Sequence, residues 1–427
     1  MMERRRLGRL LVLADDLTGA ADCAARCFTA GMPAHILLVE ADALPESLGS
    51  GATCISADSR HLTAAAAATR VAAIMARLAG VQGVRWYKKI DSTLRGNIGA
   101  ELDAMLDSLA ESGRTLTVVV SPAFPAQRRG VEDGYLVHAG TASRAGRLPA
   151  LLQQQSRRPV AHIGLETVRM QPDALAAHMR RLRQNGAEML AVDAMTDEDL
   201  AAICAAATAG LRDVLYCGSA GLVSVLAREM AECGKQPCTT RSVLPIPPKR
   251  GYVVVAVGSG SVMAHAQIAR LRSMPGCMTI EAGRAAQPDE LATALDAQAA
   301  LFHLPKPGRD TRVEGPEARA MANRLAQRVV DALYVSGANR LVLAGGDTAM
   351  QVLARLGILR LEVQDEIQPG MPLAVGEDAS GQTRVVALKA GNHGTEDSLV
   401  EIVRALTEAG SAQHGRRGSS AHNPCHM

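Results

Sequence analysis

Two adjacent carboxylates follow the first apolar run of the chain. Asp15 and Asp16 come directly after LLVLA, and Leu17-Thr18-Gly19 begins a helical pattern. Adjacent side chains of a strand point to opposite faces, so we expect one carboxylate to face a ligand and the other to cap the helix. A carboxylate in this position can accept a hydrogen bond from a sugar hydroxyl or take its proton as a general base.

A second polar cluster follows the run VRWY. Residues 88–96 read KKIDSTLRG, and a separate pair, Ser59-Arg60, follows the run ATCISA. Ammonium, guanidinium, hydroxyl and carboxylate groups together suit a substrate that is anionic at one end and polyhydroxylated at the other. A lone charge is most often part of a surface ion pair, but polar groups at the ends of several strands favour a binding site.

A third candidate segment, residues 121–140, reads SPAFPAQRRGVEDGYLVHAG. Its length predicts a long ordered loop with a functional role. Arg128, Arg129 and His138 in this loop are secondary candidates for closing over a substrate.

The second half of the chain carries three glycine turns between an apolar run and a helical pattern, at 258–260, 345–348 and 391–394. The ends of parallel strands share one edge of a sheet, so we expect these turns to converge and to present free backbone N–H groups to an anion. One such turn is common in α/β proteins, whereas three favour phosphate binding. Neither the P-loop pattern nor GxGxxG is present, which argues against a dinucleotide oxidoreductase. Lys389 stands just before the third turn, where we expect it either to contact a phosphate or to lie in solvent at the end of a strand.

The elements that carry these residues alternate between strand-length apolar runs and helical patterns, which is typical of parallel βαβ units. A length of 427 residues exceeds one ordinary core. The proline-rich segment Lys235–Arg250 predicts an interdomain linker and a hinge. We therefore predict an α/β protein with two domains, each a mostly parallel sheet flanked by helices, at 1–240 and 241–410, followed by a disordered tail at 411–427.

Composition excludes several classes of protein. The net charge of +3 without charge runs, together with 2% aromatic residues, argues against a nucleic-acid partner. The nine cysteines show no metal-binding or disulfide spacing, so we predict no metal site within the protein and a reducing cytoplasmic location. The run LLVLA is too short for a signal peptide or a membrane span. A homo-oligomer is left open.

Eight motifs, in this order between residues 14 and 394, resemble the four-carbon acid sugar kinases, the DUF1537 family. They are ADDLTGAAD, KKIDSTLRGN, SPAFPAQRRGVEDGYLVHAG, GSAGL, VGSGS, LAGGDTA, EIQPGMPLAV and LKAGNHG. The resemblance implies an N-terminal domain that binds a sugar acid and a C-terminal domain that binds ATP. Two positions depart from the family pattern: the family often has Glu where this chain has Asp347, and Phe where it has His393.

The resemblance also implies the site residues. For the acid it implies Asp16, Arg60, Lys88, Lys89, Ile90 and Asp91, and for ATP it implies Ser259, Gly345, Gly346, Asp347, Thr348 and Gly391.

By resemblance, the expected activity is phosphorylation of the C4 hydroxyl of a four-carbon sugar acid. The form KIDSTLRGN favours D-threonate, with D-erythronate and 3-oxo-tetronates as alternatives. Phosphoryl transfer generally requires Mg²⁺ with ATP. Asp16 and Asp91 are both candidate catalytic bases, and a sugar-acid sensor without transfer activity is the rival interpretation.

Overall fold

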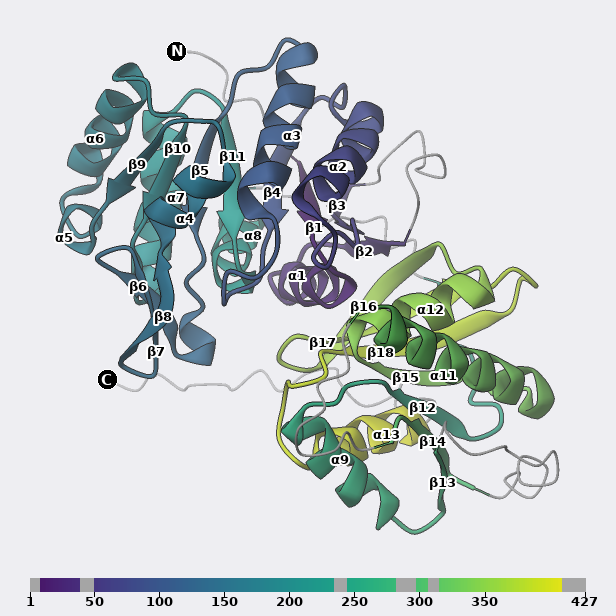
Figure 1. The fold of residues 1–427 in the computed structure, drawn as a ribbon. Coiled ribbons are helices and arrows are strands. Elements are labelled where there is room, and N and C mark those ends of the chain that lie inside the picture. Colours follow the sequence, from purple (N-terminus) through teal and green to yellow (C-terminus); the bar gives the residue numbers. More distant parts are fainter. Residues whose placement is uncertain (1–7, 39–49, 234–243, 282–296, 306–314, 409–427) are drawn as a thin grey trace, which may run out of the picture.

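The structure is a computed structural model that describes residues 8–38, 50–233, 244–281, 297–305 and 315–408. Its main feature is a sheet of 15 strands that runs through both halves of the chain (Figure 1). The predicted domain boundary at 240/241 and the predicted tail at 411–427 lie outside the described residues.

The N-terminal half of the sheet is entirely parallel, in the order β2-β3-β1-β4-β11-β5-β10-β9. Its strands are nearly continuous apolar runs, as expected where helices cover both faces. Helices α1, α6, α7 and α8 pack on one face and α2, α3 and α4 on the other. The strands are β1 (Arg9–Ala14), β2 (Ala34–Leu37), β3 (Gly51–Ser56), β4 (Val84–Lys89), β5 (Thr117–Ser121), β9 (Val160–Ile163), β10 (Met189–Val192) and β11 (Val214–Gly218). The helices are α1 (Leu17–Thr29), α2 (Ala64–Leu78), α3 (Ile98–Glu111), α4 (Leu148–Gln155), α5 (Leu165–Val168), α6 (Pro172–Gln184), α7 (Asp197–Gly210) and α8 (Ala220–Cys233).

The C-terminal half continues the sheet in the order β13-β14-β12-β15-β18-β17-β16. The first five strands are parallel, and β17 and β16 are antiparallel to their neighbours. The predicted α/β class with mostly parallel sheets is confirmed. The strands are β12 (Val253–Val257), β13 (Cys277–Glu281), β14 (Ala299–His303), β15 (Arg340–Ala344), β16 (Arg360–Gln368), β17 (Met371–Glu377) and β18 (Thr383–Lys389), and the helices are α9 (Val262–Arg272), α11 (Gly315–Ser336), α12 (Gly346–Leu356) and α13 (Ser398–Glu408).

The two halves of the sheet meet at an antiparallel pair formed by β2 and β16. Three residues of each strand pair there, with Leu361 opposite Ile36 at the centre. Beyond this pair, β16 shifts register against β17 between Val363 and Asp365 and again between Glu366 and Gln368. The sequence analysis did not predict this continuity, because β2 and β16 are far apart along the chain.

The segment 121–140, predicted as a long ordered loop, contains regular secondary structure. It contains a short 3₁₀ helix (Pro125–Gln127) and the strands β6 (Arg129–Glu132) and β7 (Tyr135–His138), which form a small antiparallel sheet with β8 (Thr141–Arg147). The turn from β6 to β7 is Asp133-Gly134, and both residues have positive φ. This backbone is typical of a tight hairpin, for which Asp-Gly is a favoured sequence.

The apolar run near the N-terminus is strand β1, as predicted. Within the described ranges, no helix combines the length and the apolar character that a membrane crossing needs.

Candidate active site

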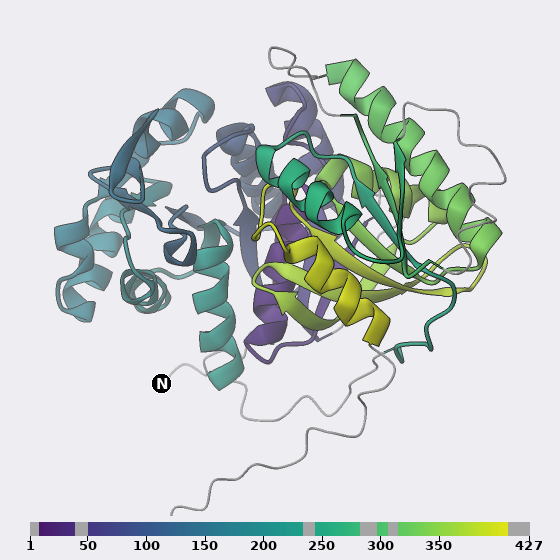
Figure 2. The same cartoon turned by 90° about the horizontal axis from the view of Figure 1, so that it is seen from below.

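A polar cavity of about 360 Å³ lies where the two halves of the molecule meet. Helix α1 contacts strands β16, β17 and β18 and helix α12 beside it (Figure 2). The cavity is lined by Asp16, Thr18, Gly19, Asp22, Arg60, Lys89, Asp91, Ser92, Thr93, Arg95, Phe124, Gln127, Arg129, Ser219, Ala220, Gly370, Ala390, Asn392 and His393.

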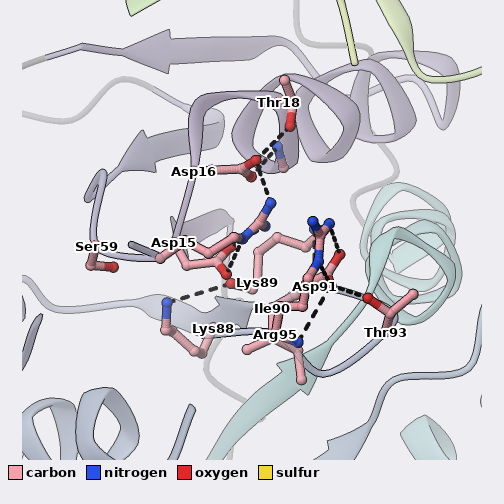
Figure 3. Close-up of polar contacts among 12 residues, drawn as sticks. Asp15, Asp16, Thr18, Ser59, Lys88, Lys89, Ile90, Asp91, Thr93 and Arg95 are labelled. Carbon is pink, nitrogen blue, oxygen red and sulfur yellow. Dashed lines mark hydrogen bonds and ion pairs between the residues drawn. The ribbon is translucent and has the colours of Figure 1, made fainter. Parts of the chain in front are cut away.

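Asp16 both caps α1 and lines the cavity. Its Oδ1 accepts a hydrogen bond of 2.7 Å from the Gly19 N–H, and its Oδ2 accepts one of 2.6 Å from the Thr18 hydroxyl (Figure 3). The sequence analysis assigned the capping and ligand-facing roles to different carboxylates, and that division is wrong. An N-cap residue has extended backbone, which lets one short side chain reach the helix N–H groups at the strand end.

The neighbouring Asp15 is buried and holds Arg60 from the other side. Arg60 donates Nε and Nη2 to the two oxygens of Asp15, at 2.8 and 2.7 Å, and Nη1 to Asp16 Oδ2 at 2.6 Å. Burial acts to raise the pKa of Asp15, but the bonds from Arg60 outweigh it and hold that pKa below its usual value. Arg60 lines the cavity, as expected of an acid-binding residue, yet its charge is already balanced.

Residues 88–91 divide between the cavity and the core. Lys88 is completely buried, with its Nζ 2.6 Å from a carboxylate oxygen of Glu101 in α3. Lys89 points the other way, lines the cavity and donates to the Ile90 carbonyl at 3.0 Å. The side chain of Ile90 packs in the hydrophobic core. Of these four residues, all expected to contact the acid, Lys89 and Asp91 line the cavity, whereas the side chains of Lys88 and Ile90 point to the other side of the sheet, because alternate strand residues face opposite sides.

Asp91 lies in the cavity wall with its oxygens already hydrogen-bonded. Arg95 donates Nε and Nη2 to it at 2.6 and 3.1 Å, and the Thr93 hydroxyl makes a short contact with the same carboxylate (Figure 3). Burial opposes ionisation, but these hydrogen bonds prevail and hold the pKa of Asp91 well below its usual range. Asp91 is therefore a weak proton acceptor.

The three glycine turns converge, as predicted, because β12, β15 and β18 are neighbours in the sheet. The Ser261 hydroxyl donates to the Gly391 carbonyl at 3.0 Å. A methyl group on Gly391 would overlap the Ser259 side chain, and one on Gly258 would overlap the Thr348 hydroxyl. Gly345 has a φ of 108°, which favours glycine directly before α12.

The first turn of α12 presents Gly346, Asp347 and Thr348, and Asp347 is exposed. Lys389, at the end of β18, is buried and donates to the Ala390 carbonyl at 2.8 Å. Burial lowers the pKa of Lys389 to about 8. Helix N-termini with close backbone packing form a cradle for phosphate oxygens.

Asp16 lies next to this cradle as well as in the cavity. A Cβ placed on Gly346 would be 3.9 Å from Asp16 Oδ2 and 3.5 Å from Thr18 Cγ2. The N-terminus of α1 and the start of α12 thus lie side by side, although they belong to different halves of the chain. A ligand hydroxyl bound at Asp16 would face the glycine turns.

Several cavity residues were missed or ranked low by the sequence analysis. Arg129 was a secondary candidate and lines the cavity, whereas its fellow candidates Arg128 and His138 do not. Gln127 and His393 were not singled out for the site, although their motifs AQRRG and GNHG marked the segments. Ser92 belongs to the predicted polar cluster 88–96, and the further cavity residues that were not proposed as candidates are Asp22, Phe124, Ser219, Ala220, Gly370, Ala390 and Asn392.

Comparison with known proteins agrees with this division of the chain. Residues 10–226 match the family model of a sugar-binding N-terminal domain, and residues 254–399 match that of a nucleotide-binding C-terminal domain. The chain belongs to the four-carbon acid sugar kinase family. It is therefore an ATP-dependent sugar-acid kinase with a nucleotide-binding domain in its second half.

The curated relatives include proteins named D-threonate kinase and proteins named 3-oxo-tetronate kinase. A D-threonate kinase of Cupriavidus necator is 33% identical, covering 93% of this chain and 98% of the relative. A D-threonate kinase of Bordetella bronchiseptica is 30% identical, covering 93% and 97%. A 3-oxo-tetronate kinase of Pectobacterium atrosepticum is 28% identical, covering 91% and 97%.

Solved structures share the fold of the chain. A Salmonella typhimurium LT2 protein described as a putative tRNA synthase is 26% identical, with a TM-score of 0.72 over 92% of this chain and 98% of its own. A Haemophilus influenzae protein of family DUF1537 is 22% identical, with a TM-score of 0.70 over 93% and 100%. The second likeness concerns the fold alone.

Proposed function

We propose that the protein transfers the terminal phosphate of ATP to the C4 hydroxyl of D-threonate, giving 4-phospho-D-threonate and ADP. The observation that carries this proposal is the position of Asp16, which lines the cavity and also lies beside Gly346 of the glycine turns. The relatives named D-threonate kinase, at 33% and 30% identity, support this acid over 3-oxo-tetronates, whose kinases are 26–29% identical. The motif KIDSTLRGN supports the same choice.

In the proposed reaction, the acid lies in the cavity with its terminal hydroxyl at Asp16. Asp16 accepts the hydroxyl proton as the oxygen attacks the γ-phosphorus, the bond from that phosphorus to the β,γ-bridging oxygen breaks, and ADP leaves. The turns at Ser259, Gly345–Thr348 and Gly391 hold the phosphates. Positioning and charge stabilisation supply most of the rate, as phosphoryl transfer involves little covalent chemistry by the protein.

Asp347 is the residue that fits a magnesium ion bound with ATP. Protein-bound Mg²⁺ usually takes one or two carboxylates together with substrate phosphates and water. Asp347 is exposed in the first turn of α12, whereas no cluster of three or more His, Cys, Asp or Glu side chains suited to a metal occurs in the described part of the chain. When bound, the ion neutralises charge on the β- and γ-phosphates.

The test is release of ADP by purified protein with ATP and Mg²⁺, measured against D-threonate, D-erythronate, L-threonate and a 3-oxo-tetronate. We expect kcat/KM to be highest for D-threonate, with the phosphate located on C4 by ³¹P–¹H NMR. A higher value for another acid would reassign the substrate. Binding of an acid without any ADP release would instead support the sensor interpretation.

The cytoplasmic location is also a proposal. Six cysteines in the described part of the chain are free thiols, five of them buried, which is compatible with a reducing compartment. Cell fractionation of the native host would test it. The homo-oligomer that the sequence left open stays untested.

A further inference from the structure

Four strongly cationic side chains line the cavity, and three of them already have acidic neighbours. The two arginines among these three present Nε and Nη2 to a carboxylate, as described above. The lysine lies beside the Asp15–Asp16 pair, because a Cβ placed on Gly19 would be 2.9 Å from its Nζ and 2.7 Å from Asp16 Oδ1, and, against the lowering effect of burial, both carboxylates raise its pKa. The four are Arg60, Lys89, Arg95 and Arg129.

Arg129 is the exception. Its Nη1 donates to two neutral oxygens, Ser92 Oγ at 2.6 Å and Gln127 Oε1 at 2.8 Å. Among the described residues, no carboxylate lies within ion-pair distance of Arg129, and its Nε and Nη2 make no hydrogen bond. Burial lowers the pKa of Arg129 and, with the nearby Arg95, outweighs the opposing effect of Asp91, so the guanidinium is partly removed from water and its charge is only partly compensated.

The Nε and Nη2 atoms of Arg129, which make no hydrogen bond to the described residues, are the atoms that two other arginines of the cavity use to bind a carboxylate. Nε and Nη2 are the pair of atoms with which Arg60 grips Asp15 and Arg95 grips Asp91. The two parallel N–H groups at these atoms match the two oxygens of a carboxylate. A ligand carboxylate would complete the third pair.

We infer that Arg129 binds the carboxylate of the sugar acid through Nε and Nη2, and so selects acids over neutral sugars. This inference rests on the proposed function. It places the carboxylate at β6 and the reacting hydroxyl at Asp16. Arg60 then acts as a positioning residue that holds Asp15 and Asp16, whereas the sequence analysis expected Arg60 to contact the acid.

The experiment compares Arg129→Gln with Arg128→Gln. The adjacent Arg128 is exposed and does not line the cavity, so its substitution removes the same charge without touching the site. We expect Arg129→Gln to raise the KM for D-threonate about 100-fold, as for loss of a partly buried charged pair, with the KM for ATP within about twofold of wild type. Arg128→Gln should leave both constants within about twofold.

A second measurement separates recognition of the carboxylate from damage to the site. Dissociation constants for D-threonate and for its primary amide, which keeps every hydroxyl, are measured by calorimetry. Wild type should prefer the acid by about 100-fold, and Arg129→Gln should bind the two ligands about equally. Damage to the site would weaken both ligands and leave their ratio unchanged.

The inference is overturned if Arg129→Gln keeps the wild-type KM for the acid, or if it keeps the wild-type ratio of acid to amide binding. If the wild-type enzyme turns over an acid, either of these two results refutes only the role of Arg129 and leaves the proposed function standing. Absence of wild-type turnover with every acid would refute the proposed function itself. If Arg129→Gln does not fold, Arg129→Lys, which keeps the charge but not the paired N–H groups, should still lose most of the preference for the acid.

Discussion

The Nε2 atoms of Gln127 and His393 lie 3.2 Å apart across the boundary between the two halves of the chain. Gln127 accepts from Arg129 through Oε1, so its amide nitrogen donates to His393. This arrangement requires His393 Nε2 to be unprotonated. Burial lowers the pKa of His393 against the opposing effect of Asp22, with Lys389, Arg26 and Arg129 adding to the lowering, so the ring is neutral at pH 7.

The first prediction is that the KM for the acid rises at low pH. The lowered pKa of His393 lies below 6.5, so the KM should be constant from pH 8 to 6.5 and rise several-fold as the pH falls further. The physical reason is that protonated His393 cannot accept from Gln127, which disturbs the partner of Arg129. Steady-state kinetics from pH 5 to 8 measure it.

Gln127→Ala provides the matched control for this pH effect. It should raise the KM for the acid at every pH and flatten the profile, because the contact with His393 is already lost. A profile that stays steep in both Gln127→Ala and His393→Phe would show that another group titrates.

The second prediction separates the two candidate bases. Asp16→Asn should lower kcat by about 100-fold or more, the usual contribution of a general base, with the KM for ATP unchanged. Asp91→Asn should lower kcat far less, because hydrogen bonds from Arg95 and Thr93 make Asp91 a weak proton acceptor. The Asn side chain of Asp16→Asn can still cap α1, so thermal melting should show that both variants are folded. A larger loss of kcat in Asp91→Asn would reverse the assignment.

The third prediction concerns Lys88, which we assign to structure. Lys88→Met leaves Glu101 buried without its partner and should lower the free energy of unfolding by about 3–5 kcal/mol. Replacing both residues, as Lys88→Met with Glu101→Leu, should recover most of that loss. Urea unfolding measures the stability, and the KM for the acid should stay near wild type in the double variant. A stable double variant with a greatly raised KM would restore Lys88 to the binding site.

The fourth prediction concerns Lys389 and the nucleotide. Burial lowers its pKa to about 8, so in the free protein the side chain loses its charge as the pH rises through 8. A phosphate binds the ammonium form, and the KM for ATP should therefore rise above pH 8, by up to about tenfold per pH unit. Lys389→Met should raise the KM at pH 7 and remove this dependence. An unchanged profile in Lys389→Met would exclude a phosphate contact.

The sequence predicts those parts of the site that depend on local pattern. The carboxylates after β1, the polar segment after β4 and the three glycine turns follow directly from strand ends in a parallel sheet. Alternation along the strand could have shown that only one of Lys88 and Lys89 faces the site, but not which of the two. The hairpin at Asp133-Gly134 also had a recognised turn signal.

Contacts between distant segments could not be predicted in this way. Whether Arg60 is free for a ligand depends on Asp15, 45 residues away in the chain. The contact of Gln127 with His393 spans 266 residues and involves side chains on two different turns. Local pattern gives the positions of such residues along each element, whereas their partners are decided by how the elements pack.

The pairing of β2 with β16 limits how the two halves of the molecule can move. A hinge confined to the linker would let one half swing as a free rigid body, but the shared ladder from His35 to Leu37 resists such a swing. Relative motion of the two halves then requires twisting of the shared sheet, in which β16 shifts register against β17 beyond Val363. The two halves of the enzyme are therefore expected to move by distortion of the sheet that they share, and not by rotation about a flexible linker.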